Sequence, residues 1–289
     1  MSYWIVTDAG CDLPLAYVQS HEKFRVISMP YGLDDREQRF GPGDEENMAE
    51  FYQKLNEGHT ATTSQISTAD YYAVFKELVR EGESLIYISL SSGLSGSIGS
   101  AVIARDMLHE EFPDAKVGIV DSLLASMGQG LLVHYALKGR EEGKDLDTLL
   151  AWLTEIRPRL NAWFTVDDLN FLFRGGRVTR TTAFFGSVLR IKPVLHMDEE
   201  GRLIPMDKVQ GRKRSLRELA DKTIATANPQ HGQTVFISHG HCEEDAKLVA
   251  KLIGDALPDT EFFISSIGSV IGTHSGPGTV AVFFLADQR

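Results

Sequence analysis

Strand-like and helix-like segments alternate through the first half of the chain, and this alternation limits the possible folds more than any other feature. The clearest strand-like run, residues 84–90, leads through a serine- and glycine-rich stretch into a helical pattern at 101–112. The run at 117–120 and the helical pattern at 124–137 repeat that order. Repetition of strand, loop and helix predicts a mostly parallel sheet with helices on both faces.

The second half is less regular but again mixes strands and helices. A helical pattern at 146–160 precedes a strand-like run at 163–166. We expect further strands at 191–196, 202–206, 234–238, 261–265 and 279–285, and helices at 215–227 and 243–257. A chain of 289 residues is long enough for two compact domains, so we expect an α/β domain at 1–155 and a second α/β domain at 156–289.

Composition and charge exclude several classes of function. The net charge is −11 and the pI is about 5.3, which disfavours nucleic acid because binding to phosphate backbones requires a basic surface. Cys11 and Cys242 are far apart and form no CxxC pair, and His239 and His241 lack further ligands, so no metal or cofactor is expected. The opening residues carry no signal-peptide pattern, and a cytoplasmic location is expected.

The stretch Ser91 to Ala101, SSGLSGSIGSA, is the most informative motif. It lies between a predicted strand and a predicted helix, where glycines allow close approach of a ligand and helix N–H groups favour an anion. It matches neither the P-loop nor the GxGxxG pattern, and without a lysine it suits a carboxylate better than a triphosphate. The alternative is an ordinary turn whose serines cap the helix.

Three further motifs have a functional and a structural interpretation. The hydroxyl-rich run at 62–67 either contacts a ligand or forms a turn before a helix near Ala69. Arg174-Gly175-Gly176-Arg177 either clamps an anion or pairs with Asp167 and Asp168. His274, in the glycine-rich loop expected at 267–278, is either an acid/base or carboxylate donor, or a structural histidine.

Together these motifs resemble the DegV family, whose characterised members are the fatty-acid-binding subunits (FakB) of bacterial fatty acid kinase. Thr63-Ser64-Gln65-Ile66-Ser67 is similar to the family's T-S-Q-P-S signature, and Leu94-Ser95-Gly96-Ser97 to its L-S-G-T-Y loop. The run from Asp168 to Arg177 resembles D-x-L-x-x-L-x-R-G-G-R, and 272–278 resembles G-x-H-x-G-P-G.

The resemblance implies a two-domain DegV-like fold, with a mixed sheet in the C-terminal domain and an acyl chain in a tunnel between the domains. It implies that Thr63 and Ser95 bind the carboxylate of a long-chain fatty acid, with Ser64, Gly96, Ser97 and His274 around it. It implies that Arg174 and Arg177 bind an anion or dock a partner. That partner would be an ATP-dependent kinase subunit that phosphorylates the bound carboxylate to an acyl phosphate.

The resemblance further favours a monomeric, non-enzymatic protein and allows transient membrane contact. The alternative function is a serine-dependent acyl hydrolase or transferase, with Ser95 as nucleophile and His274 as base. Against it, the sequence around Ser95 lacks the GxSxG spacing of a nucleophile elbow, and no aspartate stands out as a third member.

Overall fold

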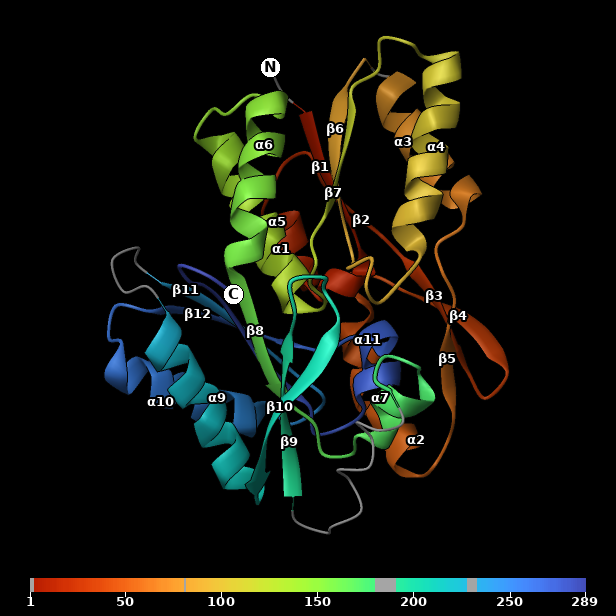
Figure 1. Ribbon diagram of the computed structural model, residues 1–289. Helices are drawn as coiled ribbons and strands as arrows, with labels where there is room; N and C mark the ends of the chain where they lie inside the picture. The colour runs from red at the N-terminus through yellow and green to blue at the C-terminus, as the bar shows by residue number, and fades with distance from the viewer. Residues whose placement is uncertain (1–2, 81, 180–190, 228–232) are drawn as a thin grey trace.

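The computed structural model describes residues 3–80, 82–179, 191–227 and 233–289 (Figure 1). Its strands are β1 (Tyr3–Asp8), β2 (Phe24–Ile27), β3 (Met29–Leu33), β4 (Arg36–Phe40), β5 (Ala61–Thr63), β6 (Ser84–Ser89), β7 (Val117–Asp121), β8 (Leu160–Thr165), β9 (Ile191–Met197), β10 (Leu203–Gln210), β11 (Thr234–His239), β12 (Glu261–Ser266) and β13 (Val280–Leu285). Its α-helices are α1 (Leu15–Gln19), α2 (Met48–Asn56), α3 (Thr68–Arg80), α4 (Ser97–Glu111), α5 (Met127–Glu141), α6 (Leu146–Ile156), α7 (Asn170–Arg174), α9 (Arg212–Thr226), α10 (Glu243–Ala256) and α11 (Ser269–Ser275).

The first sheet is parallel, in the order β2-β1-β6-β7. Successive side chains of a strand point to opposite faces, and β6 shows the consequence. Leu85 and Tyr87 belong to the core formed with α3 and α4, whereas Ile86 and Ile88 belong to the core formed with α5 and α6. Because both faces are covered by helices, β6 needs the nearly continuous apolar run that its sequence supplies.

The second sheet has six strands in the order β10-β9-β8-β13-β11-β12, and β11 and β12 are its parallel pair. Phe236 and Phe283 pack in the core that contains α5, while Ile237 and Val282 pack with α9 and α10 on the other face. Figure 1 shows α9 and α10 on the outer side of this sheet. The predicted fold class, a parallel sheet covered on both faces and a second α/β part with a mixed sheet, is confirmed.

Helix α5 lies between the two sheets. It contacts β1 and β6 of the first sheet and β8, β11 and β13 of the second. Leu131, Leu132 and Val133 are consecutive and all fully buried, as expected for a helix that is covered on several sides. One hydrophobic core therefore runs from the first sheet through α5 to the second, and the division into domains 1–155 and 156–289 stays a prediction.

A third, antiparallel sheet in the order β4-β3-β5 covers one side of the site described below. Pro30 lies within β3, although proline disfavours a strand because it has no N–H to donate. The Pro30 carbonyl accepts from Ser64 N at 3.3 Å, just past the last β3–β5 pair, so the missing N–H costs only the reciprocal bond to Ser64 at the end of that ladder. The polar segment 32–46 contains β4 of this sheet.

Several helix limits also differ from the sequence prediction. Helix α5 begins at Met127 rather than at Leu124, because Leu123 and Ser126 have positive φ angles of 54°. Helix α6 ends at Ile156, and Leu160 already belongs to β8. The stretch at 267–278 is not a loop throughout, since 269–275 form α11. None of the described helices is long and apolar enough to cross a membrane.

Candidate functional site

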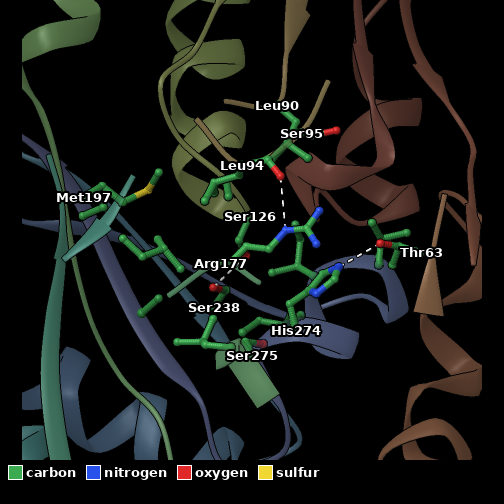
Figure 2. A pocket seen from close by; sticks show the side chains of 18 of the residues that line it. Thr63, Leu90, Leu94, Ser95, Ser126, Arg177, Met197, Ser238, His274 and Ser275 are labelled. Carbon is green, nitrogen blue, oxygen red and sulfur yellow. Dashed lines mark hydrogen bonds between the residues drawn. The ribbon is translucent and has the colours of Figure 1, made fainter. Parts of the chain in front are cut away.

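A cavity of about 480 Å³ lies between the two large sheets (Figure 2). The loops that follow β6 and β7 supply one wall, which is where ligands commonly bind in open parallel sheets. The strands of the mixed sheet supply the opposite wall with apolar side chains such as Phe164, Met197 and Phe283. Thr63, from the end of β5, and His274, from α11, contribute polar groups. The cavity thus combines a long apolar wall with a few polar groups, as small-molecule sites commonly do.

Thr63 and His274 form the most specific polar contact of the cavity. Thr63 Oγ1 lies 2.8 Å from Nε2 of His274. Burial, reinforced by the positive charge of Arg177, lowers the pKa of His274 to about 4. The imidazole is therefore neutral at neutral pH and carries its proton on one nitrogen only.

The surroundings of His274 favour the proton on Nε2. Nδ1 is buried and has no hydrogen-bond partner in the described part of the chain, and a buried N–H without an acceptor is rarer than an unused lone pair. With the proton on Nε2, His274 donates to Thr63 Oγ1. The Thr63 hydroxyl proton is then free to donate to an acceptor in the cavity.

The Arg-Gly-Gly-Arg motif folds against this pair. Gly175 packs on the imidazole, and Arg177 turns back so that its Nη1 donates to the Gly175 carbonyl and its Nε to the Leu94 carbonyl at 3.2 Å. In Figure 2 the guanidinium of Arg177 is seen between Ser95 and His274. Arg177 therefore connects α7 to the serine-rich loop and places a positive charge beside the cavity.

Arg174 occupies a different position. It is exposed, its guanidinium carbon lies 4.6 Å from the centroid of the Phe171 ring, and it lines a neighbouring cavity of about 260 Å³ that shares Thr63, Arg177 and His274. The alternative expectation was that the arginines of this motif pair with Asp167 and Asp168. Asp167 instead pairs with Lys192 and Arg212.

The serine-rich loop both caps a helix and reaches the cavity. Ser95 Oγ accepts from Ser97 N at 3.2 Å and contacts Ser97 Oγ at 3.1 Å, so Ser95, which precedes the N-cap Gly96, satisfies the first N–H group of α4. Ser95 and Gly96 line the cavity, whereas Ser97 is fully buried and its Oγ accepts from Ile66 N at 3.4 Å. The structural interpretation of this loop is therefore confirmed, and its role in binding an anion stays a prediction.

The two hydroxyl-rich motifs meet at the mouth of the cavity. A Cβ added to Gly96 would lie 2.5 Å from Nε2 of Gln65, so the glycine allows the two segments to touch. Ser64, Gln65 and Gly96 are exposed and line the cavity. Of the predicted site residues, Thr63, Ser64, Ser95, Gly96, Arg177 and His274 line this cavity, while Ser97 and Arg174 do not.

A buried network on the cavity wall was not predicted. Ser126 Oγ donates to Asp12 Oδ2 at 2.5 Å and lies 2.9 Å from Ser238 Oγ, and both serines line the cavity. Burial raises the pKa of Asp12 to about 7, although hydrogen bonds from Ser126 and Gly268 N oppose the shift. These residues lie far apart in sequence, so no local pattern could have indicated that they meet.

The geometry does not support a hydrolytic triad. The hydroxyl of Ser95 contacts Ser97, and His274 contacts Thr63 instead of Ser95. No carboxylate among the described residues orients Nδ1 of His274, and a pKa of about 4 makes the imidazole a weak base at neutral pH. In the described ranges no group of three His, Cys, Asp or Glu side chains is arranged to hold a metal ion.

Comparison with known proteins identifies the family. Residues 2–287 match the family described as "Uncharacterised protein, DegV family". A DegV domain-containing protein of Clostridium perfringens is 40% identical over 288 residues, which cover 99% of this chain and 98% of the relative. The chain belongs to the DegV family.

Solved structures of similar proteins share the fold. A DegV family protein from Thermus thermophilus, described as fatty-acid-binding, has a TM-score of 0.87 and 31% identity, and the match covers 99% of this chain and 100% of that one. A DegV lipid-binding protein from Thermotoga maritima has a TM-score of 0.85 and 29% identity over the full length of both chains. These structural neighbours are binding proteins for lipids or fatty acids.

Proposed function

We propose that this protein binds a long-chain fatty acid, with the carboxylate at Thr63 and Ser95 and the tail along the apolar wall of the large cavity. The observation that carries the proposal is the Thr63–His274 pair, which leaves one hydroxyl donor on the wall of a mostly apolar cavity. The fatty-acid-binding relatives of similar sequence and fold support the same ligand class.

The chemistry of the cavity suits this ligand. Burial of about fifteen methylenes at ~0.8 kcal/mol each gives roughly 12 kcal/mol of gross stabilisation. Ordering of the tail offsets part of that, but binding remains tight. The polar groups therefore act mainly to fix the carboxylate: Thr63 donates a hydrogen bond, Ser95 lies nearby, and Arg177 supplies positive charge.

We further propose that the protein presents the bound carboxylate to an ATP-dependent fatty acid kinase, which forms the acyl phosphate. Two features support this step. Ser64, Gln65 and Gly96 are exposed at the mouth, so the carboxylate end faces an opening, and Arg174 is exposed beside it as a candidate contact for the partner. In this view the chain is a carrier and the kinase performs the chemistry.

The two parts of the proposal are tested with one pair of variants. Thr63→Val and Ser95→Ala together remove both hydroxyl donors with small changes in volume. The double variant should lose acyl phosphate formation by a cognate kinase and should bind oleate at least tenfold more weakly in a fluorescence displacement titration. Ser92→Ala, a change at an exposed serine of the same cavity, is the control. Normal phosphorylation of oleate held by the double variant would contradict the assignment.

A further inference from the structure

The interior of the cavity contains buried hydroxyl groups that the carboxylate site does not use. Ser126, Ser238 and Ser275 line the cavity, and their exposed fractions are 4%, 0% and 6%. Figure 2 shows Ser238 and Ser275 on the side of the cavity away from Ser95. A plain alkyl tail offers these groups no hydrogen-bond partner.

The hydrogen bonds of this group do not close among the protein atoms. Ser126 has a single hydroxyl proton for two contacts, Asp12 Oδ2 at 2.5 Å and Ser238 Oγ at 2.9 Å. When Asp12 is ionised its carboxylate can only accept, so Ser126 donates to Asp12, and Ser238 donates to Ser126 and keeps its own lone pairs free. Ser275 Oγ has no partner at all in the described part of the chain. The cavity wall therefore offers an unused donor at Ser275 and an unused acceptor at Ser238.

Such groups are costly if they stay unpaired. A buried hydroxyl without a partner, such as that of Ser275, is costly because its lost hydrogen bonds to water are not replaced. Ser126 adds a backbone cost, because its φ of 54° and ψ of −145° lie in a region that glycine adopts far more easily than serine. In a cavity for a purely apolar tail, alanine at position 275 would remove the unpaired hydroxyl, and glycine at position 126 would adopt the backbone angles more easily.

We propose that the fatty acid bound by this protein carries a hydroxyl group on its chain, and that this hydroxyl accepts from Ser275 and donates to Ser238. This inference rests on the proposed function and narrows its ligand class. A hydroxyl satisfies both groups at once, whereas a keto oxygen could only accept. Because Ser275 directly follows His274 on α11, the hydroxyl belongs to the half of the chain nearer the carboxylate.

The test compares stearate with stearates that carry one hydroxyl at successive chain positions. Delipidated wild-type protein, Ser275→Ala and Ser238→Ala are titrated with each ligand in the same displacement assay. The wild type should bind one of the hydroxylated stearates about tenfold more tightly than stearate, and either variant should remove that preference. Stearate itself should bind Ser275→Ala at least as tightly as it binds the wild type.

Ser20→Ala is the matched control, because it removes a serine hydroxyl at an exposed position that does not line the cavity. It should keep the preference for the hydroxylated chain. A wild type that binds stearate but prefers no hydroxylated isomer, or a preference that survives both interior variants, would overturn the inference and leave the proposed function intact. Failure of stearate and all its hydroxylated forms to bind would instead contradict the proposed function.

Discussion

Gly175 lies directly against the imidazole of His274, and a Cβ at position 175 would overlap Nδ1 of that ring. The glycine is therefore required by the histidine, 99 positions further along the chain, rather than by its own backbone angles. This contact explains the first glycine of the Arg-Gly-Gly-Arg motif, whereas the second, Gly176, has a positive φ of 73° and makes the turn toward Arg177.

Gly175→Ala should push His274 away from Thr63 and weaken both the fold and ligand binding. Overpacking of this kind costs about 1–3 kcal/mol, and oleate affinity should fall several-fold as the Thr63 hydroxyl loses its orientation. Urea unfolding and a displacement titration measure the two effects. Gly99→Ala in α4, where nothing lies within 4 Å of an added Cβ, should be neutral or stabilising. Equal stability and affinity for Gly175→Ala and the wild type would contradict the described contact.

His274 should make the native protein sensitive to acid. Its pKa falls from 6.5 in the unfolded chain to about 4 in the native state, so the native state binds fewer protons between these values. The stability that neutral His274 contributes above pH 6.5 is therefore lost as the pH falls toward 4. His274→Gln should lose less stability than the wild type over this window in urea unfolding.

Asp12 should give the stability of the native protein the opposite pH dependence to that given by His274. Its pKa rises from 3.8 to about 7, so the native state binds more protons than the unfolded chain between these values. The stability that protonated Asp12 contributes is fully present below pH 3.8 and is lost as the pH rises toward 7. Asp12→Asn stays neutral and keeps an acceptor for Gly268 N. The free energy of unfolding of Asp12→Asn, compared with that of the wild type, should therefore increase between pH 5 and pH 8. If the difference between the two proteins stayed constant over this range, it would contradict a raised pKa of Asp12.

Gly128 should help to set the length of the fatty acid tail. A Cβ at this position of α5 would lie 2.6 Å from Cδ1 of Phe283, whose ring lines the apolar wall. Gly128→Ala should push the ring into the cavity and shift binding toward shorter chains, and Phe283→Leu in the same protein should reverse the shift. Native mass spectrometry of protein mixed with saturated fatty acids of several lengths measures the distribution. Gly254→Ala in α10, where the nearest atom is at 3.4 Å, is the control.

Much of the fold could be predicted because its signals are local. The apolar run at 84–90 and the serine-glycine loop after it define β6 and the start of α4 without any knowledge of the rest. The pairing of strands that lie far apart in sequence could not be predicted from local signals. Pro30 argues against a strand at its own position, and only the end of β5 shows why the strand tolerates it.

The site could be predicted in part. Thr63, Ser95 and His274 follow from the family motifs, and the cavity brings all three together. The path of Arg177, the contact of Gly175 with His274 and the chain from Asp12 through Ser126 to Ser238 depend on tertiary packing between segments more than 80 residues apart. Periodicity and local propensity carry no information on such contacts.

Fatty acid binding is best tested by native mass spectrometry of the freshly purified protein, followed by organic extraction. We expect one fatty acid for each chain, and uptake of one molecule of added oleate or palmitate by delipidated protein. Absence of a fatty acid in the purified protein, together with no uptake after delipidation, would contradict the proposed function.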